Sequence, residues 1–308
     1  VSMRQIRTDL AMESFQSSSE EGMRGVRVSN WETMGVKMTE VLVEEEAAAK
    51  ALGKAVGCYM TLECPGLRAR DVDARLAVSN LLGEEIARML HLDADRTVLV
   101  AGLGNRRITP DALGPLVVDR TLVTRHMFSQ IPEYADRRMQ SVCAIAPGVL
   151  GVTGVETMEI IESLVQSLRP QAIVCIDSLS ARAAARVGAT IQLTDTGIQP
   201  GSGVGNHRRA LTREALGVPV IAIGMPTVIY AATLTCDALE MLTGNDALDE
   251  DTLEGVEREL LHSDIGELIV TPRDVDDMLC DAAGVIASAV NRALQPQLSE
   301  EEILALMN

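Results

Sequence analysis

The segment TVLVAGLGNRRITPDALGP, residues 97–115, decides the expected fold, together with a second segment of similar pattern, AIVCIDSL, residues 172–179. Each begins with a short apolar run rich in β-branched residues, which is typical of a buried strand in a parallel sheet. An aspartate follows each run, Asp111 in the first segment and Asp177 in the second. If both strands belong to one open α/β sheet, both carboxylates can lie at its carboxyl edge, where such sheets place their ligands.

Strand and helix patterns alternate along most of the chain around these two segments. Apolar runs predict further strands at residues 36–43, 56–62, 141–145, 190–193, 218–223 and 268–272. Helical periodicity predicts helices at residues 44–52, 72–92, 112–128, 156–168, 228–242, 253–261, 273–294 and 300–307, and a short helix carrying Arg182 and Arg186. No shift in composition marks a domain boundary. The sequence therefore predicts one three-layer α/β/α domain with a mainly parallel or mixed sheet.

Composition excludes several classes of function. The 308 residues carry a formal net charge of −17, which weighs against direct binding to nucleic acid because phosphate contacts need a basic face. No apolar run reaches the roughly 18 residues of a membrane helix, and no secretory signal is visible, so a soluble intracellular protein is expected. The six cysteines contain no Cys-x-x-Cys pair, so no zinc site is expected, and Cys175 reads as a small buried hydrophobe.

The loops leave three interpretations open. Gly102 and Gly104 follow a strand as in a dinucleotide fingerprint, but the third glycine is absent. The glycine-rich loops at residues 148–154 and 197–205 lack the Gly-Lys-Ser/Thr ending of a phosphate loop, which favours ordinary tight turns. Asp111 and Asp177 can each be a helix N-cap, or together they can serve as acid and base in hydrolysis of a peptide bond. Spacing alone does not decide between these roles.

A collinear set of motifs resembles the germination protease family of spore-forming bacteria. The motifs are RTDLA (7–11), LGN (103–105), TPDALGP (109–115), TRH (124–126), APGV (146–149), TGVET (153–157), IDSL (176–179) with Ala181 and Arg182, GSGVGN (201–206) and PVIAIG (219–224). The resemblance implies an atypical aspartic endopeptidase that degrades small acid-soluble spore proteins during germination. It implies a zymogen that removes its own propeptide, a homotetramer, a location in the forespore or spore core, and a fold related to hydrogenase-maturation proteases.

The resemblance also assigns residues. It implies that Asp111 and Asp177 are catalytic and that no cofactor is needed. It places self-cleavage between Asp9 and Leu10, because Thr-Asp-Leu-Ala-x-Glu is similar to the Thr-Glu-Ile-Ala-Ser-Glu type of sequence cut in the substrates, with Ile or Phe after the acidic residue. Residues 1–9 would then be a short propeptide and residues 10–308 the catalytic domain.

Cleavage after an acidic residue calls for a cationic pocket, and a bidentate arginine suits a carboxylate. The candidates lie in or beside the motif loops and are Arg106, Arg107, Arg125, His126, Arg182, Arg208 and Arg209. The alternative is that most of them are solvated surface charges or intersubunit pairs, and that His126 is a packed or capping residue. A metal-assisted peptidase of the maturation-protease kind, a non-catalytic binding protein and a nucleotide-binding protein remain alternative functions.

Overall fold

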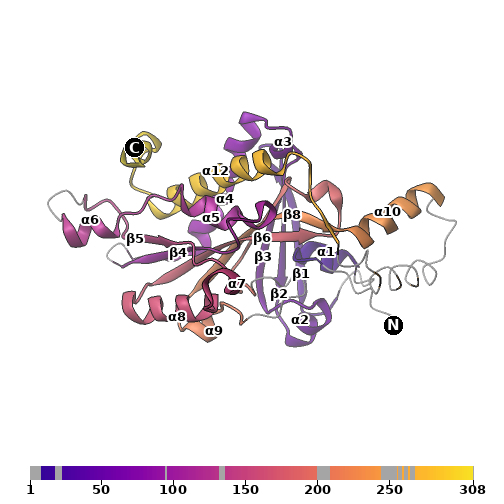
Figure 1. The fold of residues 1–308 in the computed structure, drawn as a ribbon, viewed down its shortest axis with the longest axis horizontal. Helices are drawn as coiled ribbons and strands as arrows, with labels where there is room; N and C mark the ends of the chain where they lie inside the picture. The colour runs from indigo at the N-terminus through magenta and orange to yellow at the C-terminus, as the bar shows by residue number, and fades with distance from the viewer. Residues whose placement is uncertain are drawn as a thin grey trace.

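One mixed sheet organises the chain in the computed structural model, which describes residues 8–17, 23–93, 96–131, 136–199, 209–243, 255, 259, 263 and 268–307. The described strands form a nine-stranded sheet in the order β1-β2-β3-β7-β8-β6-β4-β5, with β9 paired to β8 (Figure 1). The strands are β1 (Val26–Thr33), β2 (Val36–Val43), β3 (Gly57–Glu63), β4 (Val98–Gly102), β5 (Val142–Ile145), β6 (Ala172–Ala181), β7 (Thr190–Thr194), β8 (Val220–Tyr230) and β9 (Ile269–Val270).

The sheet has a parallel half and an antiparallel half. Strands β5, β4, β6 and β8 run parallel, whereas β1, β2, β3 and β7 pair antiparallel to their neighbours, and the halves join between β7 and β8. Every residue of β4 and β8 is buried, as expected for strands that helices cover on both faces. Along β4, Val98 and Val100 belong to one hydrophobic cluster and Leu99 and Ala101 to another, so successive side chains point to opposite faces.

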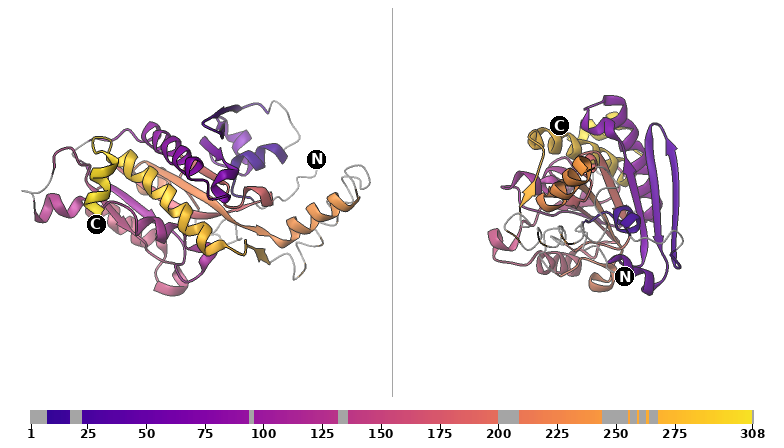
Figure 2. Two further views of the ribbon diagram at one scale, coloured as in Figure 1. Left: turned by 90° about the horizontal axis from the view of Figure 1, so that it is seen from above. Right: turned by 90° about the vertical axis from the view of Figure 1, so that its right-hand side faces the viewer.

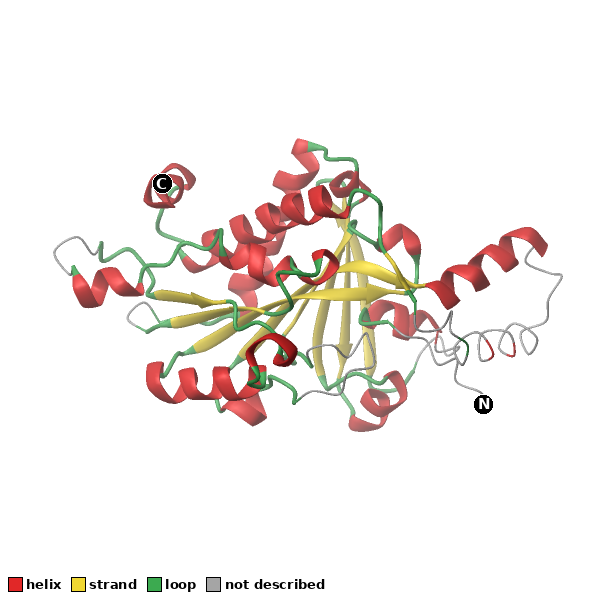
Figure 3. Cartoon of the chain, viewed as in Figure 1, coloured by secondary structure: helices red, strands yellow, loops and turns green. Residues whose placement is uncertain are grey.

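Helices cover both faces of the parallel half (Figure 3). The helices α4 (Val72–Met89), α5 (Leu113–Val118) and α12 (Val275–Leu294) lie on one face, where α4 and α12 run side by side (Figure 2). Helix α8 (Thr157–Leu168) and the short α9 (Arg213–Leu216) lie on the opposite face. The remaining helices among the described residues are α1 (Ala11–Ser17), α2 (Glu46–Leu52), α3 (Pro65–Arg68), η1 (Thr109–Asp111), α6 (Arg125–Gln130), α7 (Leu150–Thr153), η3 (Ala184–Arg186), α10 (Ala231–Thr243) and α13 (Glu300–Met307). The predicted three-layer α/β/α arrangement with a mixed sheet is confirmed.

The prediction that a strand ends before Asp177 is wrong. Strand β6 continues through Asp177 to Ala181 because its carboxyl half stays paired with β8, across a register irregularity after Leu179. Only the 3-10 turn η3 follows, in place of the helix expected around Arg182 and Arg186.

The helix predicted at residues 112–128 is also wrong in its length, because side-chain hydrogen bonds interrupt it. Helix α5 ends at Val118, and α6 begins only at Arg125. Between them, the Asn291 side chain accepts a hydrogen bond from Leu122 N–H at 2.8 Å, and the buried Thr124 hydroxyl donates to Gln140 O at 2.5 Å. These contacts hold the chain against α12 and β5 in a non-helical path.

Two further outcomes concern other segments. Strand β1 was not predicted, since most of its residues are exposed and it lacks an apolar run. The helix predicted at residues 253–261 lies almost entirely outside the described residues. Within the described ranges, no helix combines the length and apolar character needed to cross a membrane.

Candidate active site

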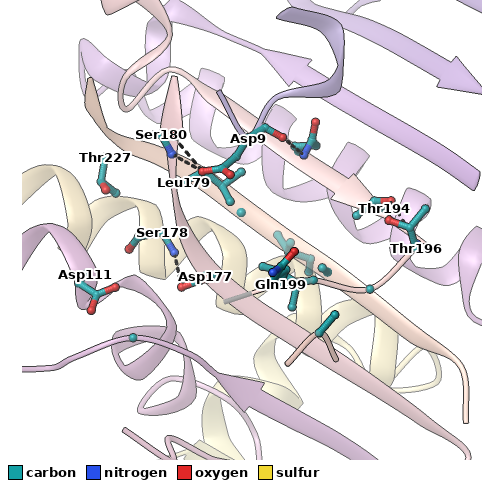
Figure 4. A pocket seen from close by; sticks show the side chains of 18 of the residues that line it. Asp9, Asp111, Asp177, Ser178, Leu179, Ser180, Thr194, Thr196, Gln199 and Thr227 are labelled. Carbon is teal, nitrogen blue, oxygen red and sulfur yellow. Dashed lines mark hydrogen bonds between the residues drawn. The ribbon is translucent and has the colours of Figure 1, made fainter. Parts of the chain in front are cut away.

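A cavity of about 560 Å³ lies at the carboxyl edge of the parallel strands. Its walls come from the loop between β4 and α5, from the carboxyl half of β6, from β7 and β8, and from the segment that precedes α1. Asp111 and Asp177 both line it, and so does Asp9. Figure 4 shows the side chains of Asp111 and Asp177 directed into this pocket, with Asp9 beside Ser180.

Asp111 is positioned by a loop that folds back on itself. Its Oδ2 accepts a hydrogen bond from Asn105 N–H at 2.8 Å, and α5 begins after Ala112 without a side-chain cap. Gly104 has φ +105°, and a Cβ there would lie 2.1 Å from Asp111 O, so only glycine fits. The Thr227 hydroxyl of β8 donates to Pro110 O at 2.7 Å and ties this loop to the sheet.

Asp177 is held rigidly because it lies inside a buried strand. It is 6% exposed, and its Oδ1 accepts from Ser178 N–H at 2.9 Å. The two aspartate segments meet at Gly114, where a Cβ would lie 2.6 Å from Ile176 O, and Leu103 N–H donates to the same oxygen at 2.7 Å. This close packing brings the loop that carries Asp111 against the strand that carries Asp177.

The segment around Asp9 is bound in the same cavity. The Asp9 carboxylate Oδ2 accepts from Ser180 N–H at 2.8 Å and from the Ser180 hydroxyl at 3.0 Å, while Asp9 N–H donates to Ser180 O at 3.1 Å. The Asp9 carbonyl oxygen accepts from Lys54 Nζ at 2.8 Å and from Gln192 Nε2 at 3.1 Å. Both the side chain and the carbonyl of Asp9 are therefore engaged.

The residues that follow Asp9 are anchored by packing and by an ion pair. Leu10 and Ala11 are fully buried, and the Glu13 carboxylate accepts from Arg186 Nη1 at 2.7 Å. The N–H groups of Arg182 and Ala183 also donate to Glu13, at 2.8 and 3.0 Å.

Burial shifts the pKa of several groups in and beside the cavity, among them Lys54 and Cys175. The ammonium of Lys54 has a lowered pKa because burial removes it from water, although the charges of Asp9 and Glu13 oppose this effect. Burial raises the pKa of the Cys175 thiol, and the nearby charge of Asp177 adds to the effect. A protonated, strand-interior thiol is a poor nucleophile, in agreement with the interpretation of Cys175 as a hydrophobe.

The cationic candidates from the sequence lie elsewhere. Arg106 forms an ion pair with Asp119 and donates to Pro115 O at 3.2 Å. Arg107, Arg125, His126 and Arg209 are exposed, and Arg208 lies outside the described residues. None of the six whose positions are described lines the cavity.

Lys54 is the cationic side chain among the described residues that do line the cavity, and sequence reasoning missed it. It follows the left-handed Gly53 that ends α2, and nothing in its neighbourhood resembles a motif. The hydrogen bonds from Lys54 to the carbonyl oxygens of Thr8 and Asp9 join residues more than forty positions apart in the sequence, so no local sequence signal was available. Within the described ranges, no group of three or more potential metal-ligating side chains is present.

Comparison with known proteins agrees with the motifs. The family description "Germination protease" matches residues 1–263. A germination protease of Clostridium tetani is 41% identical over 321 residues, covering 98% of this chain and 99% of that protein. Those of Caldanaerobacter subterraneus subsp. tengcongensis and Bacillus mycoides are 42% and 38% identical, covering 98% and 96% of this chain and 98% and 95% of their own lengths.

Among solved structures, the hydrogenase maturation protease HycI of Thermococcus kodakarensis aligns with 68% of this chain and 99% of its own, at a TM-score of 0.38 and 15% identity. The family assignment therefore rests on the sequence matches, which extend over nearly the full length of both partners. This chain belongs to the germination protease family and is a peptidase.

Proposed function

We propose that this peptidase hydrolyses peptide bonds with Asp111 and Asp177 as a pair of carboxyl groups. The observation that supports the pair is that both carboxylates line one cavity, each held by backbone N–H groups and by close backbone packing. Two carboxyl groups in one site tend to share a proton, because like charge raises the pKa of one of them. One is then ionised and the other protonated in the same pH range.

In the proposed reaction, the ionised aspartate takes a proton from a water molecule, and the water oxygen forms a bond to the substrate carbonyl carbon. The protonated aspartate then donates its proton to the leaving nitrogen as the carbon–nitrogen bond breaks. The first step leaves both carboxyl groups protonated and the negative charge on the substrate oxygen. The second step transfers one proton from the pair to the leaving nitrogen and returns the negative charge to the pair, so protons and charge balance over the complete reaction. Positioned acid and base groups of this kind accelerate a reaction by roughly 10²–10⁴-fold each.

We further propose that the substrates are small acid-soluble spore proteins, cut after an acidic residue, and that the chain removes its own residues up to Asp9. Asp9 already lies in the cavity with its carboxylate and carbonyl bound. Residues 1–9 are then the propeptide, residues 10–308 are the catalytic domain, and the active form is a homotetramer.

The test is the rate at which the purified enzyme cuts a small acid-soluble spore protein, followed by mass spectrometry of the products. Asp111→Asn and Asp177→Asn should each lower kcat by at least roughly 10²-fold, with cleavage sites in the parent reaction located after Glu or Asp. Asp119→Asn, which alters an exposed carboxylate outside the cavity, is the matched control and should retain the parental rate. Parental rates in both cavity variants would refute the carboxyl pair.

A further inference from the structure

Two hydrogen-bond donors converge on one carbonyl oxygen in the cavity. Lys54 Nζ and Gln192 Nε2 both donate to Asp9 O, at 2.8 and 3.1 Å, from the end of α2 and from β7. The Gln192 amide also accepts from Ala11 N–H at 2.7 Å, so its orientation is fixed and it holds the backbone on both sides of Leu10. Such a pair of donors polarises a carbonyl group and stabilises negative charge on its oxygen.

The register of the sheet relates these donors to the proposed carboxyl pair. Asp177 of β6 pairs with Gly224 of β8, and Gly224 pairs with Gln192 of β7. Directly paired residues point to the same face of a sheet. Asp177 and Gln192 therefore project from the same face, with their Cα atoms about 10 Å apart. Gly224 itself has no side chain between them, and the Leu179 side chain packs over it, since a Cβ at Gly224 would lie 2.5 Å from Leu179 Cγ.

A third residue, Ser180, contacts the side chain of Asp9, the residue before the proposed cleaved bond. Ser180 lies three residues beyond Asp177 and is 2% exposed, so its N–H and hydroxyl bind the Asp9 carboxylate away from bulk water. Hydrogen bonds to a charged group in such a setting are stronger than neutral ones. An asparagine in place of Asp9 would keep one acceptor oxygen but lose the charge that strengthens both hydrogen bonds.

We propose that Lys54 and Gln192 are the oxyanion-binding groups of this peptidase and that Ser180 recognises the acidic residue before the cleaved bond. This inference rests on the proposed cleavage after Asp9. As water adds to the Asp9 carbonyl carbon, the carbonyl oxygen gains the negative charge, and both donors are already at hydrogen-bond distance from it. When the bond between the Asp9 carbonyl carbon and the Leu10 nitrogen breaks, one aspartate of the pair protonates the nitrogen and takes up the negative charge. The two donors then no longer face a charged oxygen.

Self-processing of the full chain measures this chemistry directly, as the first-order rate at which the intact mass falls to that of a chain beginning at Leu10. Lys54→Met and Gln192→Met remove one donor each and should slow the rate by about 10²-fold. Lys54→Arg retains a cationic donor and should recover most of the rate. Lys50→Met, which changes an exposed lysine of the preceding helix α2, is the matched control and should process at the parental rate.

Recognition of the acidic side chain is tested with a double-mutant cycle in the same assay. Ser180→Ala should slow processing of the Asp9 chain by about tenfold, because one hydrogen bond to a charged group is lost. In a chain that carries Asp9→Asn, the same substitution should have much less effect. Equal effects in both chains would show that Ser180 acts on folding rather than on recognition. Thermal unfolding of each variant verifies that the fold is retained.

The outcomes separate this inference from the function on which it rests. If Asp111→Asn and Asp177→Asn abolish processing while both methionine variants keep the parental rate, the oxyanion role is refuted and the carboxyl pair stands. If the aspartate variants process normally, the proposed function falls. If the parent chain never shortens, self-processing is refuted. The cleavage rates of the parent and of the two methionine variants are then measured on an added peptide of residues 4–17. Equal rates in all three proteins again refute the oxyanion role.

Discussion

Substitution of Gly114 by alanine should separate the two aspartate segments with the smallest possible chemical change. A Cβ at this position would lie 2.3 Å from Leu103 O, 2.4 Å from Leu103 N and 2.6 Å from Ile176 O. All three neighbours are backbone atoms, from Leu103 just after β4 and from Ile176 within β6, so no side chain can rotate away. Since ordinary contacts begin near 3.4 Å, the start of α5 must retreat from the sheet by about 1 Å.

That displacement has two consequences of different size. Overpacking of this kind lowers the free energy of unfolding by about 1–3 kcal/mol. It also moves the loop that carries Asp111 relative to Asp177, and an error of about 1 Å in catalytic geometry can cost about 10²-fold in rate. Activity should therefore fall much further than stability.

The assay is denaturant unfolding of Gly114→Ala together with kcat on a spore-protein substrate. Gly284→Ala is the matched control, because a Cβ at this position in α12 meets nothing within 4 Å. It should keep the parental rate and gain up to about 1 kcal/mol of stability. A Gly114→Ala enzyme with parental stability and rate would refute the claim that this contact fixes the two carboxylates.

Three further results are expected. Activity should fall at alkaline pH as Lys54 loses its proton, because burial lowers the pKa of Lys54. A Lys54→Arg enzyme, which stays charged, should keep its rate over the same pH range. Identical pH–rate profiles of the two enzymes would argue against the oxyanion role of Lys54. Arg186→Met should lower the free energy of unfolding by about 3 kcal/mol, because it leaves the buried Glu13 carboxylate without its cation. Arg24→Met, which breaks only an exposed pair, should change it by less than about 0.5 kcal/mol, as denaturant curves would show. Dialysis against a strong chelator should leave kcat unchanged, whereas a loss that added zinc restores would favour a metal-assisted peptidase.

Local sequence patterns were sufficient for the framework of the fold. The apolar runs that became β4 and the first half of β6 are buried on both faces, so their composition reflects their position directly. The two runs belong to one sheet, where β4 pairs with β6, and Asp111 and Asp177 both line one cavity in the structure. The catalytic roles of the two aspartates stay a prediction.

Tertiary contacts decided what local patterns did not. Residues 178–181 continue β6 because β8 pairs with them, and polar β1 forms because β2 provides its partner. The contacts of Lys54 and Gln192 with Asp9 join positions that are 45 and 183 residues apart. An arginine pocket was expected from charge alone, but the bound carboxylate of Asp9 is held by Ser180, a neutral residue that carries no such signal.

The most direct test of the central claim is the intact mass of the purified chain over time, at neutral and mildly acidic pH, beside Asp111→Asn and Asp177→Asn. We predict that the parent alone loses the residues up to Asp9 and that neither variant shortens at a comparable rate. Equal shortening of all three proteins would contradict the account, because the carboxyl pair would then take no part in the cleavage.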